Sequence, residues 1–140
     1  MTKVPDPRGR PTVPFDSVEP GAEVGSFSYA LDEKTVSRHL RATQQAPYAE
    51  PFAPVSILAA DGVNLADRHS DSSQSVHAAQ RIAVFALPRL GSTLSVRGRA
   101  AAKWVRKGRR YVEVETETSD DAGVRIATGV TTGVVVYSDH

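Results

Sequence analysis

Hydrophobic and polar residues alternate through most of the second half of the chain, as they do in half-buried β-strands. An earlier stretch, residues 26–31, alternates in the same way. Short glycine-containing turns separate the later stretches, and short links between consecutive strands predict an antiparallel meander. The four later strands are expected at residues 76–87, 94–105, 111–118 and 124–137.

Two helices are predicted between the first strand and the other four. Asp32 is a favourable N-cap for the first, in which Val36 and Leu40 recur at helical spacing until Ala46-Pro47 breaks the pattern. Residues 55–68 form a second helix that is apolar around most of its circumference, which is typical of a buried helix. A buried helix among five strands predicts an α+β domain in which an antiparallel sheet wraps round a central helix.

Proline punctuates the start of the chain. Five prolines within the first 20 residues predict an extended N-terminal arm over residues 1–20, because proline removes backbone donors and disfavours helix before it. Phe15 and Val18 are expected to anchor this arm on the domain. The remaining residues, 21–140, have a length suited to one domain.

Composition narrows the chemistry. Seventeen Lys and Arg against 16 Asp and Glu give a net charge of +1, which fits a globular protein and gives little support to nucleic-acid binding. The absence of cysteine excludes a thiolate nucleophile, and the four histidines have no metal-ligand spacing, so no metal site is expected. Without an apolar run of membrane-spanning length or a signal peptide, we expect a cytoplasmic protein with no membrane contact.

The order of these elements, together with several short motifs, resembles the MaoC-like dehydratase branch of the hot-dog fold. Arg41-Ala42-Thr43 ends the first helix as that family's Arg-Ala-Thr-Gly-Asp stretch does. Residues 88–96 are similar to its Pro-x-x-x-Gly-Asp-x-Leu-x-Val turn, residues 111–123 to its closing hairpin and residues 15–21 to its opening segment. The resemblance covers about residues 15–137.

This resemblance implies an acyl chain carried as a thioester on coenzyme A or an acyl carrier protein, with no separate cofactor. It also implies a tunnel at a dimer interface. Hydratases of the family add or remove water with an Asp and a His five positions later, whereas this chain has Gln45 and Glu50 there. Gln45 can orient water but cannot take a proton, and Glu50 is either a base, if it is buried, or a solvated loop residue.

A shortened loop without the Asp/His pair resembles the non-catalytic half of two-part MaoC-like hydratases. We therefore expect a partner or degenerate subunit in fatty acid, polyketide or steroid-type acyl metabolism, assembled as a homodimer or with a related hot-dog chain. The alternative is an active hydratase or a hot-dog thioesterase that uses Glu50 or Asp61. In such a thioesterase Asp61, on the central helix, would attack the thioester or activate a water molecule. Otherwise Asp61 lies with Asn64 and Arg68 on a polar stripe, at the dimer seam or under solvent.

The histidines offer one further candidate. His77 opens the first meander strand in a His-x-x-Gln element similar to that of the non-catalytic halves, and its imidazole can also carry a proton near neutral pH. His39 is expected to be exposed on the first helix, and His69 to lie at the negative end of the central helix.

Seven cations lie between Arg97 and Arg110 with no acid among them, and five acids follow between residues 111 and 121. Antiparallel pairing of these stretches would set cations opposite carboxylates on a solvated face. The functional alternative is a grip for the phosphates of coenzyme A or for an acidic carrier-protein surface. The residues assigned to it are Arg106, Lys107, Arg109 and Arg110.

Overall fold

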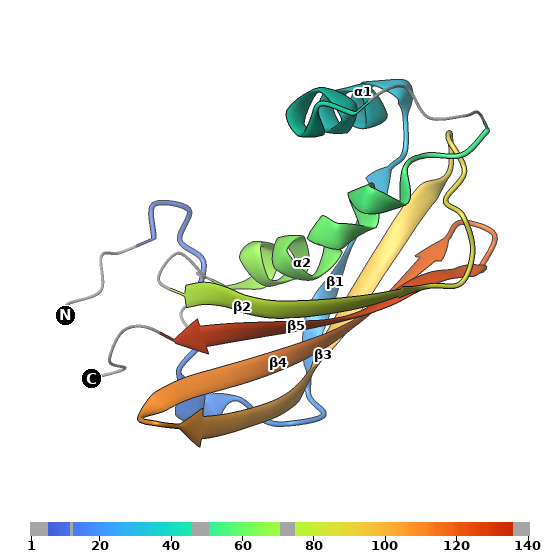
Figure 1. Cartoon of the computed structure of the whole chain (residues 1–140). Helices are drawn as coiled ribbons and strands as arrows, with labels where there is room; N and C mark the ends of the chain where they lie inside the picture. The colour runs from blue at the N-terminus through green and yellow to red at the C-terminus, as the bar shows by residue number, and fades with distance from the viewer. Residues whose placement is uncertain (1–5, 12, 46–50, 71–74, 136–140) are drawn as a thin grey trace.

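The computed structural model describes residues 6–11, 13–45, 51–70 and 75–135. Five antiparallel strands form one sheet, and the helix α2 lies against one of its faces (Figure 1). The strands are β1 (Glu23–Ala30), β2 (Ser75–Val84), β3 (Thr93–Arg106), β4 (Arg109–Asp120) and β5 (Arg125–Val135). The helices are the 3-10 turns η1 (Phe15–Ser17) and η2 (Val55–Ala60) and the α-helices α1 (Glu33–Thr43) and α2 (Asp61–His69). The predicted α+β class is confirmed.

The strand order is β1-β3-β4-β5-β2, which corrects the predicted meander. β3, β4 and β5 do follow one another, but β2 pairs with β5 and not with the strand after it. The segment between β2 and β3 crosses the end of the sheet instead of forming a hairpin. There the Leu90 N–H donates to the Pro51 carbonyl and the Gly91 N–H to the Leu31 carbonyl. The turn residues between β2 and β3 are compatible with a hairpin and with a crossover, so the local sequence pattern could not show which connection is formed.

Small residues on the inner face of the sheet let α2 approach closely. Gly98, Thr116 and Gly129 are aligned across β3, β4 and β5. A Cβ atom on Gly98 would collide with Leu65 of α2, and one on Gly62 would collide with the Thr131 hydroxyl. Leu65 is fully buried, so the closest packing of helix and sheet lies at this row.

The second predicted helix is divided and only partly buried. Its first part is the 3-10 helix η2, and the α-helix begins at Asp61. Leu58 and Leu65 are buried against the sheet, whereas the side chains of Val55 and Val63 are 37% and 40% exposed. The prediction of a helix buried around most of its circumference is therefore wrong for the single chain, because no described residue fully covers the outer side of η2 and α2 at these two valines.

The first helix has both predicted ends. The Asp32 carboxylate accepts a hydrogen bond from the Thr35 N–H at 2.7 Å, and this bond lowers the pKa of Asp32. At the C-terminus Gln44 adopts a left-handed conformation (φ 55°), with its N–H donating to the Arg41 carbonyl and the Gln45 N–H donating to the Leu40 carbonyl. This pair of bonds is a Schellman motif, in which glycine is the preferred residue at the left-handed position.

Replacing Gln44 by glycine is expected to raise the free energy of unfolding by roughly 0.5–1 kcal/mol, because glycine adopts positive φ without steric cost. Urea unfolding followed by circular dichroism measures the change. Thr43→Gly is the matched control: Thr43 is inside α1, where glycine is expected to destabilise by a few tenths of a kcal/mol up to about 1 kcal/mol. A loss of stability in Gln44→Gly would contradict the cap assignment.

The N-terminal arm is anchored on the domain. Phe15 is buried, as predicted, and the Lys103 ammonium donates to the Phe15 and Asp16 carbonyls at 3.1 Å each. Val18 is half-buried. Further towards the N-terminus, the Arg10 guanidinium donates to the Asp67 carboxylate of α2 at 2.6 Å. The described part of this arm, which includes the 3-10 helix η1, therefore contacts both the sheet and the central helix.

Candidate functional site

Gln45 lies just beyond α1 and belongs to a hydrogen-bonded cluster with η2. The Ser56 hydroxyl donates to the Gln45 side-chain oxygen at 3.3 Å, and the His39 Nε2 lies 2.8 Å from the same hydroxyl. When Ser56 donates to Gln45, its oxygen accepts from His39, which requires the tautomer with a proton on Nε2. His39 is half-buried, so the prediction that it is exposed is wrong: α1 turns its imidazole towards η2.

This cluster brings together an amide that can orient water and an imidazole. A glutamine amide does not act as an acid or a base near neutral pH, whereas an imidazole can. Sequence reasoning missed the association because His39, Gln45 and Ser56 come from separate elements and fit no known spacing rule. Glu50 lies outside the described residues, so its predicted role as a base remains a prediction.

Asp61 begins α2 and points into the domain. Its side chain is almost fully buried, and each carboxylate oxygen accepts one hydrogen bond: the Tyr29 hydroxyl donates at 2.8 Å and the Thr118 hydroxyl at 2.8 Å. The predicted polar stripe of Asp61, Asn64 and Arg68 is therefore wrong for Asp61. Arg68 instead lies with its guanidinium 4.7 Å from the centre of the Phe27 ring.

Burial sets the electrostatics of this carboxyl group. Desolvation raises the pKa of Asp61 to about 6, although the hydrogen bonds from Thr118 and Tyr29 favour the carboxylate. Burial and the adjacent carboxylate also raise the pKa of Tyr29. The cavity beside Asp61 measures about 10 Å³, which is room for about one water molecule and not for an acyl chain. In this conformation Asp61 links α2 to the sheet and is not presented to a thioester.

The other two described histidines, His69 and His77, lie on different elements from the cluster of His39, Ser56 and Gln45. His77 is exposed on β2, and the Gln80 amide of the same element donates to the Ala59 carbonyl of η2 at 2.7 Å. The His69 Nε2 donates to the Ser26 carbonyl of β1 at 2.9 Å, which ties the end of α2 to the sheet. No described contact joins His77 to Gln45 or to Asp61, so its role as a proton carrier remains a prediction.

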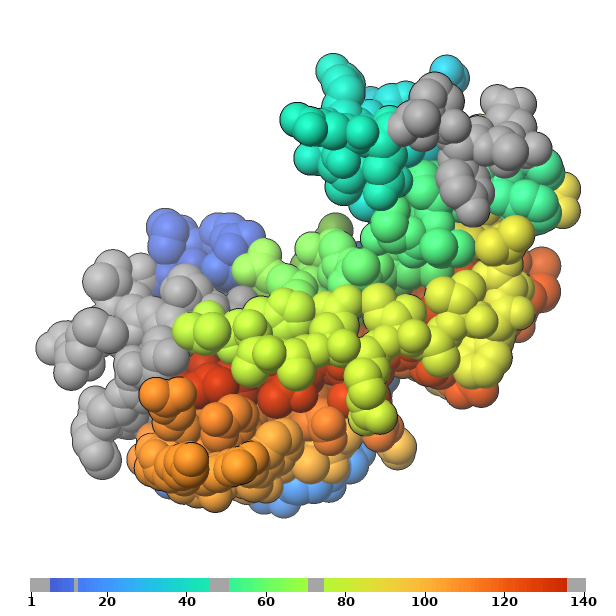
Figure 2. All heavy atoms as spheres, in the orientation of Figure 1, coloured from blue at the N-terminus to red at the C-terminus, as the bar shows by residue number. Residues whose placement is uncertain are grey.

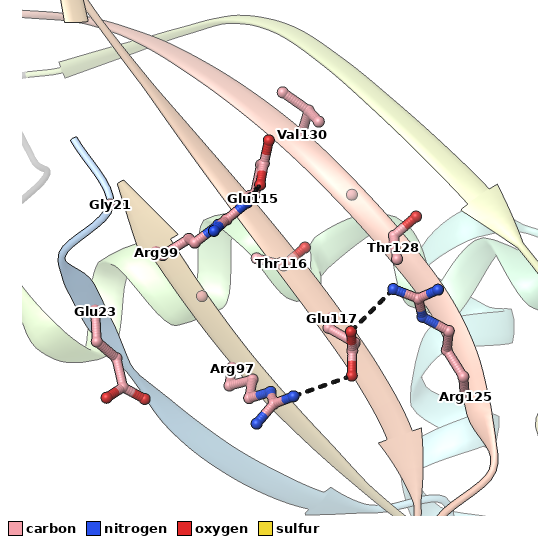
Figure 3. Close-up of a pocket in the computed structure, with 12 residues that line it drawn as sticks. Gly21, Glu23, Arg97, Arg99, Glu115, Thr116, Glu117, Arg125, Thr128 and Val130 are labelled. Atoms are coloured by element: carbon pink, nitrogen blue, oxygen red, sulfur yellow. Dashed lines mark hydrogen bonds and ion pairs between the residues drawn. The ribbon is translucent and has the colours of Figure 1, made fainter. Parts of the chain in front are cut away.

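The face of the sheet away from α2 carries the paired charges that the sequence predicts. Arg97 bonds Glu117 at 3.3 Å, and Arg99 bonds Glu115 at 2.7 Å across β3 and β4. Arg125 of β5 also reaches Glu117, at 3.0 Å. These side chains line an open groove of about 600 Å³ (Figure 3), whose charges largely neutralise one another.

The remaining cations lie at the tip of the β3–β4 hairpin. This tip is at the opposite end of the sheet from α1 (Figures 1 and 2). The structure therefore does not bring the predicted grip together with Gln45, and its ligand remains a prediction. The grip consists of Arg106, Lys107, Arg109 and Arg110.

Neither a metal cluster nor a membrane span is found in the part of the chain that the structure describes. In those ranges no three His, Asp or Glu side chains gather as metal ligands. Among the helices there, none is both long and apolar enough to cross a membrane.

The sequence matches no family model and no curated protein, but the fold has clear structural relatives. The chain is similar to the monoamine oxidase regulatory protein from Archaeoglobus fulgius (TM-score 0.78, 12% identity, 92% of this chain and 97% of that chain). It is also similar to the MaoC-like dehydratase from Rhodospirillum rubrum (0.72, 14%, 91% and 99%). A third relative is the HadBC complex, a 3R-hydroxyacyl-ACP dehydratase from Mycobacterium tuberculosis (0.62, 20%, 81% and 96%).

Proposed function

We propose that this chain, which has the hot-dog fold of the MaoC-like dehydratases, binds acyl thioesters and serves as a non-catalytic partner of a hydratase or dehydratase. Coenzyme A or phosphopantetheine would enter as part of the substrate. Addition of water to an enoyl thioester needs proton transfer and polarisation of the carbonyl, so the proposal includes no other cofactor.

One observation carries the proposal: Gln45 stands where the family resemblance requires an ionisable carboxylate. Its amide is held by Ser56 at the end of α1, in the helix-end geometry that the Arg41-Ala42-Thr43 motif predicts. The side chain at this position is therefore held in place by a hydrogen bond, but it is an amide and cannot transfer a proton as a carboxylate would. Such a site can line an acyl pocket and orient water, while the proton transfers fall to another chain.

The surface of the single chain supports a second subunit. β2 is an edge strand, paired on one side only, and Val76, Ile82 and Val84 along it are more than a third exposed. An exposed edge strand offers unpaired backbone groups with which another chain can pair, and exposed apolar surface is typical of interaction sites. The HadBC dehydratase, whose fold this chain shares, is itself described as a complex.

Restoring the missing pair tests the proposal. Wild-type protein alone is expected to bind saturated acyl-CoA, seen as a rise in melting temperature with ligand concentration, and to leave enoyl-CoA unchanged. The double variant Gln45→Asp/Glu50→His is expected to hydrate enoyl-CoA at least about 100-fold above wild type, the lower range for a positioned acid or base. Loss of the enoyl-thioester absorbance measures turnover.

Each single variant, Gln45→Asp and Glu50→His, is the matched control and should stay near the wild-type rate. Turnover by the wild-type chain that Glu50→Gln or Asp61→Asn abolishes would contradict the partner role and support the active-enzyme alternative.

The hydrogen-bonded cluster favours a second candidate: an active hydratase with His39 as its proton carrier. The 2.8 Å contact between His39 and Ser56 and the 3.3 Å bond from Ser56 to Gln45 place an imidazole one hydroxyl away from a water-orienting amide. In the same assay, wild-type turnover that His39→Gln abolishes and Asp61→Asn preserves would favour this candidate over the partner role.

A further inference from the structure

The β3–β4 hairpin tip, defined as residues 104–111, carries four cations, of which Arg110 lies over the Phe15 ring and the other three are engaged by no described group. Among the described residues, no hydrogen bond, ion pair or ring contact engages Arg106, Lys107 or Arg109. The chain has no acid between residues 100 and 112. The turn η1 contacts this region through Phe15, whose ring lies 5.8 Å from the Arg110 guanidinium, and the carbonyl of the exposed Asp16 binds Lys103. This contrasts with Arg97 and Arg99, which are paired with glutamates further along the same strands.

Exposed apolar side chains accompany these cations. The rings of Trp104 and Tyr111 stack across the hairpin, with centroids 5.3 Å apart and planes within 3° of parallel. Trp104 is 37% exposed and Val105 is 60% exposed. Trp, Tyr and Arg are the residues that most often dominate the energy of protein interfaces. The hairpin tip lies at the end of the sheet opposite α1 (Figure 1), and the exposure of Trp104 and Val105 leaves part of each side chain available to a partner.

The turn itself holds lysine at a costly position. Lys107 and Gly108 both have positive φ, 51° and 74°, as the two central residues of a type I′ turn do. Asn or Gly is preferred at the first of these positions, and a lysine there carries a steric cost because its Cβ disfavours positive φ. A residue held in a sparsely populated conformation at an exposed tip points to a function other than folding.

From these features we propose that the hairpin tip docks an acidic acyl carrier protein, the source of the acyl thioester in the function proposed above. Clustered cations complement an acidic protein surface, and the projecting Trp104 and Val105 supply apolar contacts that a protein partner can bury. Small ligands such as free coenzyme A bind in concave pockets, whereas this tip is a projection. The proposal therefore assigns the tip to the protein part of the carrier.

Purified holo acyl carrier protein and free coenzyme A are the probes, each titrated into the full chain by isothermal calorimetry at low and moderate salt. The carrier protein is expected to bind with an affinity that falls as salt rises. Arg106→Glu/Arg109→Glu is expected to weaken it at least tenfold. Lys107→Asn should weaken it several-fold while leaving the unfolding free energy equal to or above that of wild type, because asparagine suits the turn.

Lys34→Glu/Arg38→Glu is the matched control, since it makes the same charge change on α1 at the other end of the sheet. Equal weakening by this control, no binding of the carrier protein, or competition by free coenzyme A at equal concentration would each overturn the docking site. If one of these results is found and the chain still binds acyl-CoA, the docking site is rejected and the proposed function is not. If the chain binds the carrier protein but does not bind acyl-CoA, the proposed function is rejected and the docking site is not.

Discussion

Leu65→Ala is expected to lower the free energy of unfolding by roughly 2–5 kcal/mol, the usual cost of emptying a buried leucine site. Leu65 is fully buried and fills the space above Gly98, at the closest contact of α2 with the sheet. Urea unfolding followed by tryptophan fluorescence and by far-ultraviolet circular dichroism measures the change. Val63→Ala, on the exposed side of the same helix, is the control and should cost less than about 1 kcal/mol.

A double-mutant cycle makes this prediction specific to the contact. Gly98→Ala alone is expected to cost about 1–3 kcal/mol, because its Cβ would collide with Leu65 and press on the Glu115 carbonyl. With Leu65→Ala already present the leucine no longer occupies that space, so most of the added cost should disappear. Additive losses would show that Gly98 is needed for a reason other than the approach of α2.

The second large effect is a pH dependence of stability that arises from Asp61. Burial raises the pKa of Asp61 from its ordinary value of 3.8 to about 6 in the folded chain, so the folded state holds this proton more tightly than the unfolded state. The stability contributed by the proton is complete below pH 3.8 and is lost as the pH rises through about 6. A shift of about two pKa units corresponds to about 3 kcal/mol.

Asp61→Asn is expected to remove this loss, because an amide stays neutral throughout the range. The free energy of unfolding, measured from about pH 4 to about pH 7.5, should fall for wild type relative to the variant. Asp67→Asn is the control: Arg10 and Arg8 lower the pKa of Asp67, so its contribution has the opposite sign. If the loss persists in Asp61→Asn, another group causes it.

Local sequence determined the elements and their ends. Alternation located all five strands to within a few residues, and Asp32 and Arg41-Ala42-Thr43 marked the two ends of α1. The same local information identified Phe15 as an anchor and predicted that cations of one strand lie opposite carboxylates of the next, as Arg97 and Arg99 do. The strands, the ends of α1 and the charge pairs depend on neighbours in the chain or on consecutive strands, so spacing is sufficient to predict them, whereas Phe15 is anchored by a strand 88 positions away.

The sequence by itself also predicted, through the family resemblance, that Gln45 occupies the position of that family's catalytic aspartate. Only the tertiary structure decided that β2 lies beside β5, that His39 joins Gln45 through Ser56, and that Asp61 is buried. The Asp61 hydrogen bonds show the physical reason, because Tyr29 and Thr118 are 32 and 57 positions away along the chain. Partners this far apart in the chain leave no periodic pattern in the sequence from which burial could be predicted. Because Asp61 is buried by them, it links the helix to the sheet and is not a nucleophile exposed to substrate.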